Sequence, residues 1–171
     1  RYVHLRTGNY NPTTARIYTD TGIFTSDDAI ADDVSALFNL LTGYSQGHSW
    51  NKLIVAPEDL HRRTISLIEE QTRLAEEGRP SFIFAKLNSL VDRRTIEALY
   101  RASQAGVPIE LVIRGICCLR PQIEGLSENI RVISIVDRFL EHSRILVFGK
   151  EEPQIFMSSA DWIPLNFYRR V

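Results

Sequence analysis

The stretch LEHSRILVFGKEEPQIFMSSAD, residues 140–161, decides the fold of this chain. It opens on the polar triplet His-Ser-Arg, in which His142 and Arg144 precede an apolar run at residues 145–148. A turn follows, and a second apolar run at 154–157 ends in the polar group Ser-Ser-Ala-Asp. Two apolar runs on either side of a turn predict a β-hairpin. The polar residues at its two open ends are therefore expected to meet in space.

The segment before the hairpin alternates between strand and helix patterns. Asp92 is the expected N-cap of one helix, and Gly106 its expected C-terminal stop. The expected strands are 53–56, 81–87, 109–113 and 130–135, and the expected helices are 57–77 and 92–105. This order predicts an α/β domain with a mainly parallel sheet flanked by helices. Ligands bind such sheets beyond the carboxyl ends of the strands, where the polar clusters NSLVD, RGICCL and SSAD occur.

The N-terminal part is organised differently. Short strands are expected at residues 2–5 and 15–19, followed by a helix at 27–41 with Ser26 as its N-cap. The segment TGYSQGHSWN, residues 42–51, is polar and rich in Gly and Ser, so we place a domain boundary there. The chain opens and closes on strand-like residues, from which we expect a piece of a longer protein.

Composition excludes several broad classes. The formal net charge of −1 provides no general attraction to nucleic acid or to an anionic membrane. The sequence contains no apolar stretch of membrane-spanning length, and we expect no signal peptide. The two cysteines are adjacent, and there is no second pair to complete a zinc site. We expect a cytoplasmic protein that does not bind nucleic acid.

Two half-motifs carry a family resemblance. His142-x-Arg144 followed by SSAD is one, and TGNYN at residues 7–11 is the end of another that lacks its His-x-Lys in this chain. They resemble the H-x-K…G-S-x-N pattern of the phospholipase D superfamily, in which two halves form one active site. Longer strings resemble bacterial polyphosphate kinase, at YVHLRTGNYNPTTARIYTD (2–20), ASQAGVPIELVIRGICCL (102–119) and LSENIRVISIVDRFLEHSRI (126–145).

This resemblance implies a phospholipase D-like fold and an activity. Residues 1–52 are expected to be the C-terminal part of a first phospholipase D-like domain, and residues 53–171 most of a second. The family transfers the terminal phosphoryl group of ATP to inorganic polyphosphate, reversibly, through a phosphohistidine. That histidine and the ligands of Mg²⁺ are expected upstream of this chain, so no metal ligand is expected within it. The implied partners are ATP or ADP, polyphosphate and further copies of the full-length protein.

The resemblance also implies site residues. Tyr18, Arg114 and His142 match nucleotide-contacting positions of the family, and His142 would support catalysis as an acid or base. Arg144 is a weaker candidate, which with the facing Ser158 and Ser159 could converge with His142 on one anion. Three of them have a simpler interpretation. Arg114 could be an arginine at a strand end in a salt bridge, His142 a structural histidine, and Tyr18 a tyrosine that packs in a strand.

Two positions depart from the patterns. Arg6 stands where the family has a small residue in its HLGTGN string, and Gly149 stands where the wider superfamily has an aspartate. The second departure counts against one alternative, a phospholipase D-like phosphodiesterase or phosphatidyltransferase. Another alternative is a non-catalytic anion-binding module, which would also describe this chain if it lacks the nucleophile of its enzyme.

Overall fold

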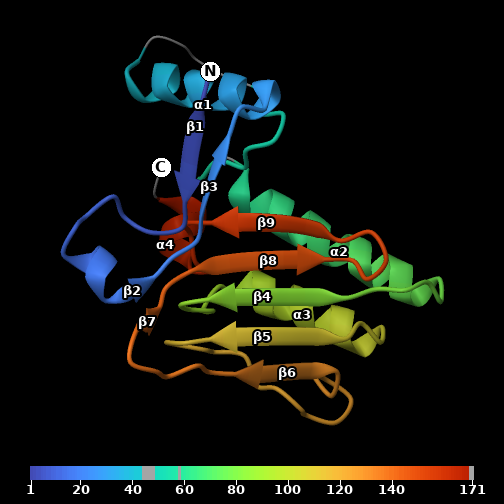
Figure 1. The fold of residues 1–171 in the computed structure, drawn as a ribbon. Coiled ribbons are helices and arrows are strands. Elements are labelled where there is room, and N and C mark those ends of the chain that lie inside the picture. The colour runs from blue at the N-terminus through green and yellow to red at the C-terminus, as the bar shows by residue number, and fades with distance from the viewer. Residues whose placement is uncertain (44–48, 58, 170–171) are drawn as a thin grey trace.

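The computed structural model describes residues 1–43, 49–57 and 59–169 (Figure 1). The part of the chain before residue 50 contains β1 (Val3–Arg6), a 3₁₀ helix (Thr14–Arg16), β2 (Tyr18–Thr19), β3 (Gly22–Thr25) and α1 (Asp28–Leu41). The remainder contains α2 (Leu60–Glu76), β4 (Ile83–Leu87), α3 (Arg93–Gln104), β5 (Ile109–Ile113), β6 (Ile130–Ile133), β7 (Leu140–Glu141), β8 (Arg144–Phe148), β9 (Gln154–Ser158) and α4 (Pro164–Tyr168).

A five-stranded sheet in the order β6-β5-β4-β8-β9 forms the centre of the molecule. The strands β6, β5 and β4 are parallel, and β8 runs antiparallel to both of its neighbours. All strands except β8 therefore point the same way, which confirms the predicted mixed, mainly parallel α/β sheet. The carboxyl ends of β4, β5 and β9 consequently share one edge with the start of β8.

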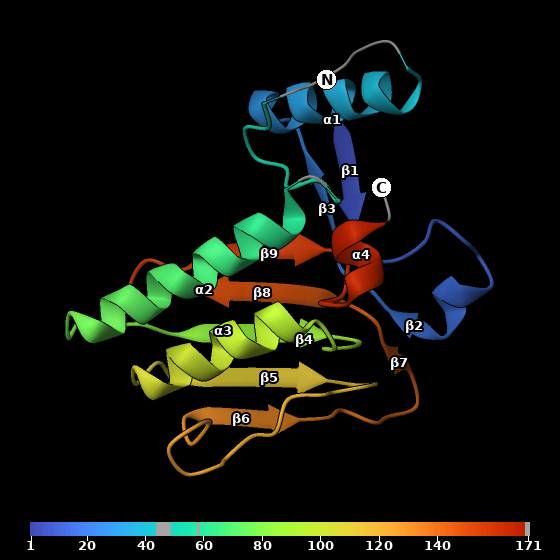
Figure 2. The ribbon, with the colours of Figure 1, turned by 180° about the vertical axis from the view of Figure 1, so that it is seen from behind.

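The helices α2 and α3 lie side by side over one face of this sheet (Figure 2). Alternate residues of β4, namely Ile83, Ala85 and Leu87, are buried, as the period of two in a strand requires. Asp92 is the N-cap of α3, because its carboxylate accepts a hydrogen bond from the Thr95 backbone N–H. The polar residues that follow the strands thus lie at a well-anchored sheet edge.

The segment before residue 50 packs against this edge through few elements. β1 and β3 form an antiparallel pair beside α1, and β2 pairs in parallel with β7 (Figure 1). Asp33 in α1 is fully buried, and its carboxylate accepts hydrogen bonds from the backbone N–H groups of Asn51, Lys52 and Leu53 at 2.7–3.1 Å. These bonds hold α1 to the segment that leads into α2.

Four predictions about individual helices and strands were wrong. Residues 53–55 form no strand, since Asp33 binds the backbone of Leu53. The helix α1 is capped by Asp27 and not by Ser26, and α2 begins at Leu60 and not at residue 57. Of the expected strand at 15–19, residues 15–16 belong to the 3₁₀ helix, and only Tyr18–Thr19 form a strand.

The end of the chain also differs from its expected strand, because residues 164–168 form α4. The Tyr168 hydroxyl lies 3.2 Å from Asp92 and 3.1 Å from His61, so it joins α4 to α2 and α3. Residues 44–48 of the expected domain boundary lie outside the described residues. Within the described part, no helix is long and apolar enough to cross a membrane.

Candidate functional site

The half-motifs of the sequence meet at a cavity of about 330 Å³ on the carboxyl edge of the sheet. Its lining comes from the TGN turn after β1, the segment before β8, the end of β9 and α4. The lining residues are Thr7, Gly8, Asn9, Ala56, His142, Arg144, Ser159, Ala160 and Asn166. Two segments separated by more than a hundred residues therefore build one site.

His142 is held at this cavity by the β2–β7 pairing. Its backbone N–H and that of Ser143 both donate to the Thr19 carbonyl oxygen, at 3.1 and 2.9 Å. Its Nδ1 lies 2.8 Å from the carboxylate of Asp20, and its ring is 4.7 Å from the Tyr18 ring. A hydrogen bond from Nδ1–H to Asp20 leaves Nε2 as the nitrogen that can exchange a proton with a ligand.

Asp20 was not among the predicted site residues, although it ends the quoted string RIYTD. Burial raises the pKa of this carboxyl, but hydrogen bonds from His142 and Thr7 and the charge of Arg6 outweigh that effect, so its pKa is lowered. A Cβ on Gly8 would lie 1.9 Å from Asp20 Oδ2, so the turn needs glycine here. The turn and His142 are thus joined through one ionised carboxylate.

Arg144 is buried and forms a two-pronged ion pair with Asp161. Its Nε and Nη2 each donate to the Asp161 carboxylate at 2.9 Å. Its Nη1 donates to the His142 carbonyl oxygen at 3.1 Å and lies 3.4 Å from His142 Nε2. Two of its nitrogens are therefore paired with a carboxylate, while Nη1 faces His142 beside the cavity.

Ser158 and Ser159, which were expected to face His142 and Arg144, have different surroundings. Ser159 lines the cavity, whereas Ser158 Oγ exchanges hydrogen bonds with Ala160, at 3.0 Å from its N–H and 3.2 Å from its carbonyl oxygen. On the neighbouring strand β4, Lys86 Nζ donates to Ser143 Oγ at 2.5 Å and to Glu141 at 2.7 Å. That contact fixes the start of β8 on the sheet.

Arg114 and Tyr18 lie outside the set of described residues that line the cavity. Arg114 follows β5, and its Nη2 donates to Asn88 Oδ1 at 2.5 Å, while its buried Nε has no hydrogen-bond partner among the described residues. Tyr18 contacts the site through its ring, which packs at a tilt of 36° against His142. The structure thus brings Tyr18, His142 and Arg144 together, and places Arg114 at the end of β5, which β4 separates from β8.

The two departures from the sequence patterns have clear positions. The Arg6 guanidinium lies 3.5 Å from Asp20 and 5.6 Å from the centre of the Tyr10 ring, so it braces the TGN turn. Gly149 has φ of +101° in the turn between β8 and β9, at the end of β8 opposite to Arg144. A carboxylate at Gly149 would therefore lie away from the cavity.

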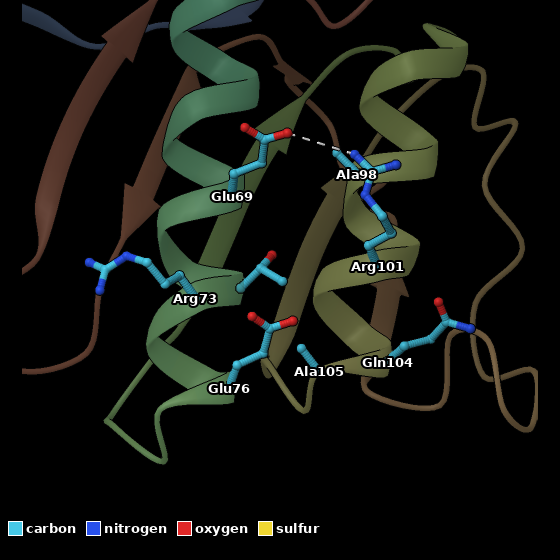
Figure 3. A pocket seen from close by; sticks show the side chains of 8 residues that line it. Glu69, Arg73, Glu76, Ala98, Arg101, Gln104 and Ala105 are labelled. Carbon is cyan, nitrogen blue, oxygen red and sulfur yellow. Dashed lines mark ion pairs between the residues drawn. The ribbon is translucent and has the colours of Figure 1, made fainter.

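A second, larger hollow of about 620 Å³ lies between α2 and α3, with charged side chains around it (Figure 3). Across it, Arg101 and Glu69 approach to 3.9 Å, and both are more than half exposed. It contains no predicted site residue, and solvated charges of this kind bind ligands weakly. The smaller cavity, where buried charges converge, is the better candidate.

Comparison with known proteins decides the family. The model of polyphosphate kinase C-terminal domain 2 matches residues 53–171, and that of polyphosphate kinase C-terminal domain 1 matches residues 1–47. The chain belongs to the polyphosphate kinase family. This agrees with the resemblance that the sequence strings carry.

Individual polyphosphate kinases match over the full chain. Those of Thermosynechococcus vestitus and Synechocystis sp. are 52% and 53% identical to it. The crystal structure of polyphosphate kinase from Porphyromonas gingivalis superimposes with a TM-score of 0.93 and 43% identity over 99% of this chain. The chain spans 24% of each of the two relatives and 26% of the solved chain.

The ligands of Mg²⁺ were expected upstream of residue 1. Among the described residues, no group of three or more His, Cys, Asp and Glu side chains is arranged to hold a metal ion. Two carboxylates belong to the site around His142 and Arg144. Asp20 contacts His142 Nδ1, and Asp161 accepts hydrogen bonds from Arg144. The location of the Mg²⁺ ligands outside this chain stays a prediction.

Proposed function

We propose that this chain is the C-terminal part of an ATP:polyphosphate phosphotransferase. The enzyme would transfer the terminal phosphoryl group of ATP to inorganic polyphosphate, and the reverse reaction would return it to ADP. The observation that carries the proposal is the array Asp20–His142–Arg144 beside the cavity, in a chain of the polyphosphate kinase family. Such an array joins an oriented acid or base to a cation.

Phosphoryl transfer needs positioned groups and compensation of charge on the transferring oxygens. With Nδ1–H directed at Asp20, His142 presents Nε2. Protonated, Nε2 would donate to an oxygen that gains charge, and neutral, it would accept a proton. Arg144 Nη1 lies 3.4 Å from Nε2, so a phosphate oxygen at His142 would also meet this guanidinium.

Arg114 and Tyr18 have the supporting roles in this proposal. Arg114 would bind phosphate oxygens of ATP, because its guanidinium is always charged and provides several donors in one plane. Its Nη2 donates to Asn88 Oδ1, which holds the guanidinium at the end of β5. Tyr18 would limit the rotation of the His142 ring that it packs against.

The remaining parts of the reaction would lie in the full-length protein. The phosphorylated histidine and the ligands of Mg²⁺ are proposed to precede residue 1, and residues 1–52 and 53–171 to be parts of two phospholipase D-like domains. ATP or ADP and polyphosphate would be the partners, with no nucleic acid. A cytoplasmic homo-oligomer is the proposed form.

One alternative has a specific observation against it. A phospholipase D-like phosphodiesterase would have the aspartate of the superfamily motif at position 149, where this chain has Gly149 in the turn between β8 and β9. A non-catalytic anion-binding module remains an outcome for the isolated chain. Its cavity would bind phosphate without transferring it.

The test is phosphoryl transfer from γ-labelled ATP to two proteins, this chain and a version extended upstream through the His-x-Lys motif. Acid-labile label is expected only on the longer protein and is expected to move to polyphosphate. Replacing Arg114 or His142 with Ala should abolish that label. Label on this chain alone would contradict the upstream nucleophile, and release of a phospholipid head group by the longer protein would favour the phosphodiesterase.

A further inference from the structure

We propose that Asp161 is a positioning residue that holds Arg144 and Arg114 in one array. The inference deepens the function proposed above and rests on it. Asp161 follows β9 in the SSAD group and is 6% exposed. It lies where the edges of β4, β8 and β9 meet, so it is placed to organise several strand ends at once.

The first arm of the array is the ion pair with Arg144. Nε and Nη2 of this guanidinium each lie 2.9 Å from a different oxygen of Asp161. Two parallel hydrogen bonds fix the plane of a guanidinium as well as its position. Arg144 Nη1 is consequently directed to His142, which it contacts at the carbonyl oxygen and near Nε2.

The second arm runs through Asn88. Asp161 Oδ1 accepts the backbone N–H of Asn88 at 2.7 Å and that of Ser89 at 3.3 Å. The Asn88 side chain then accepts from Arg114 Nη2 at 2.5 Å. One carboxylate therefore places Arg144 directly and Arg114 through a single intervening residue.

The turn after Arg114 leaves this second arm little freedom. The Gly115 N–H donates to the Asn88 carbonyl oxygen at 2.7 Å. A Cβ on Gly115 would approach the same oxygen to 2.9 Å, closer than such atoms pack. The ends of β4 and β5 are thus in direct contact, and a shift of Asn88 would move Arg114.

Asp161 is expected to act through these neighbours. Its two oxygens accept four hydrogen bonds from Arg144, Asn88 and Ser89, so the chain itself uses its acceptor capacity. Neutralising it would leave the buried Arg144 charge uncompensated and its guanidinium free to turn. Phosphate would then bind at least as tightly, but in a geometry that is unsuited to transfer.

The experiment compares Asp161→Asn with Asp33→Asn in the full-length protein. Both aspartates are buried and accept several hydrogen bonds, but the hydrogen bonds described for Asp33 come from the segment around Asn51, whereas Asp161 binds Arg144. For Asp161→Asn, kcat is expected to fall about 10- to 100-fold while KM for ATP stays equal or falls. Asp33→Asn should lower the thermal midpoint and leave both constants unchanged. Equal kcat in the two variants would overturn the proposal.

A second variant covers the case in which Asp161→Asn does not fold. Asn88→Ala removes the side chain that orients Arg114 but keeps the Arg144–Asp161 pair. If Asn88 acts through Arg114, then Asn88→Ala should lower kcat in the wild type and have a smaller effect in an Arg114→Lys background, which keeps the positive charge but loses the guanidinium that Asn88 orients. Additive losses in kcat would contradict the second arm.

Failure of the proposed function would be visible separately. A wild-type protein that transfers no phosphate from ATP to polyphosphate would refute that function. Titration of tripolyphosphate into the wild type and Asp161→Asn would still test the array. A raised affinity in Asp161→Asn, absent from Asp33→Asn, would support the array as an anion site, and a weakened affinity in Asp161→Asn would refute it.

Discussion

Asp33 and Asp161 are both buried carboxylates that join distant segments, yet their partners differ. Asp33 accepts hydrogen bonds from three consecutive backbone N–H groups and from the Asn51 amide. Asp161 accepts two from a guanidinium beside a cavity. A carboxylate satisfied by fixed backbone donors stabilises a fold. One that is paired with a cation near a ligand site also sets the geometry and charge of that site.

The largest expected effect is the loss of stability when the structural carboxylate, Asp33, is removed. Asp33→Ala would leave the N–H groups of residues 51–53 buried without that acceptor, and should lower the free energy of unfolding by about 3 to 4 kcal/mol. Denaturant unfolding measures this change. Phosphoryl transfer per folded molecule should be unaltered. A large fall in kcat with normal stability would show that the Asp33 anchor serves the site.

Asp33 also shows why part of the fold was not predictable. The apolar residues 53–56 have the composition of a short strand, but the Leu53 N–H is bound by a side chain twenty positions earlier. A long-range bond of this kind leaves no trace in local periodicity. By contrast, Asp92 caps its own helix three residues away, and that element was predicted correctly.

In the candidate site, the motif residues could be predicted from the sequence, but their carboxylate partners could not. His142 and Arg144 stand in a recognisable motif, and both line the cavity. Their carboxylate partners, Asp20 and Asp161, were missed because each pairing depends on how separate strands align. The available signal was an acidic residue at the end of each resembling string, RIYTD and SSAD.

The next effect in size concerns the second site carboxylate, Asp20. Asp20→Asn keeps the shape of the side chain but can donate its amide hydrogen to His142 Nδ1, which favours the tautomer with the proton on Nε2. Phosphoryl transfer in the full-length protein should fall about 100-fold, mainly in kcat. Steady-state kinetics at several ATP concentrations measures this change.

The matched control is Asp33→Asn, in which a more deeply buried carboxylate loses its charge away from His142. Its kcat should stay at the wild-type value while its thermal midpoint falls. If Asp20→Asn also kept the wild-type kcat and lost only stability, then Asp20 would be a structural anchor of the TGN turn through Thr7. Asp20 and Asp33 would then have the same kind of role, contrary to the proposal.

The smallest effect is a pH dependence that belongs to the structural carboxylate. Burial raises the pKa of Asp33, but hydrogen bonds from the backbone of Leu53, Lys52 and Asn51 outweigh it and lower the pKa from 3.8 to about 2. A lowered folded pKa means that the stabilisation is complete above about pH 4 and is lost as pH falls toward 2. The shift corresponds to about 2 kcal/mol.

Denaturant unfolding between pH 5 and pH 2.5 would measure it against Asp33→Asn, which cannot ionise at this position. The wild type should be the more stable protein at the upper end of this range, and the difference should shrink as the carboxylate becomes protonated. A difference that stays constant would mean that Asp33 contributes through shape alone. Its contrast with Asp161 would then lie only in which atoms it contacts, because its charge would contribute nothing to stability.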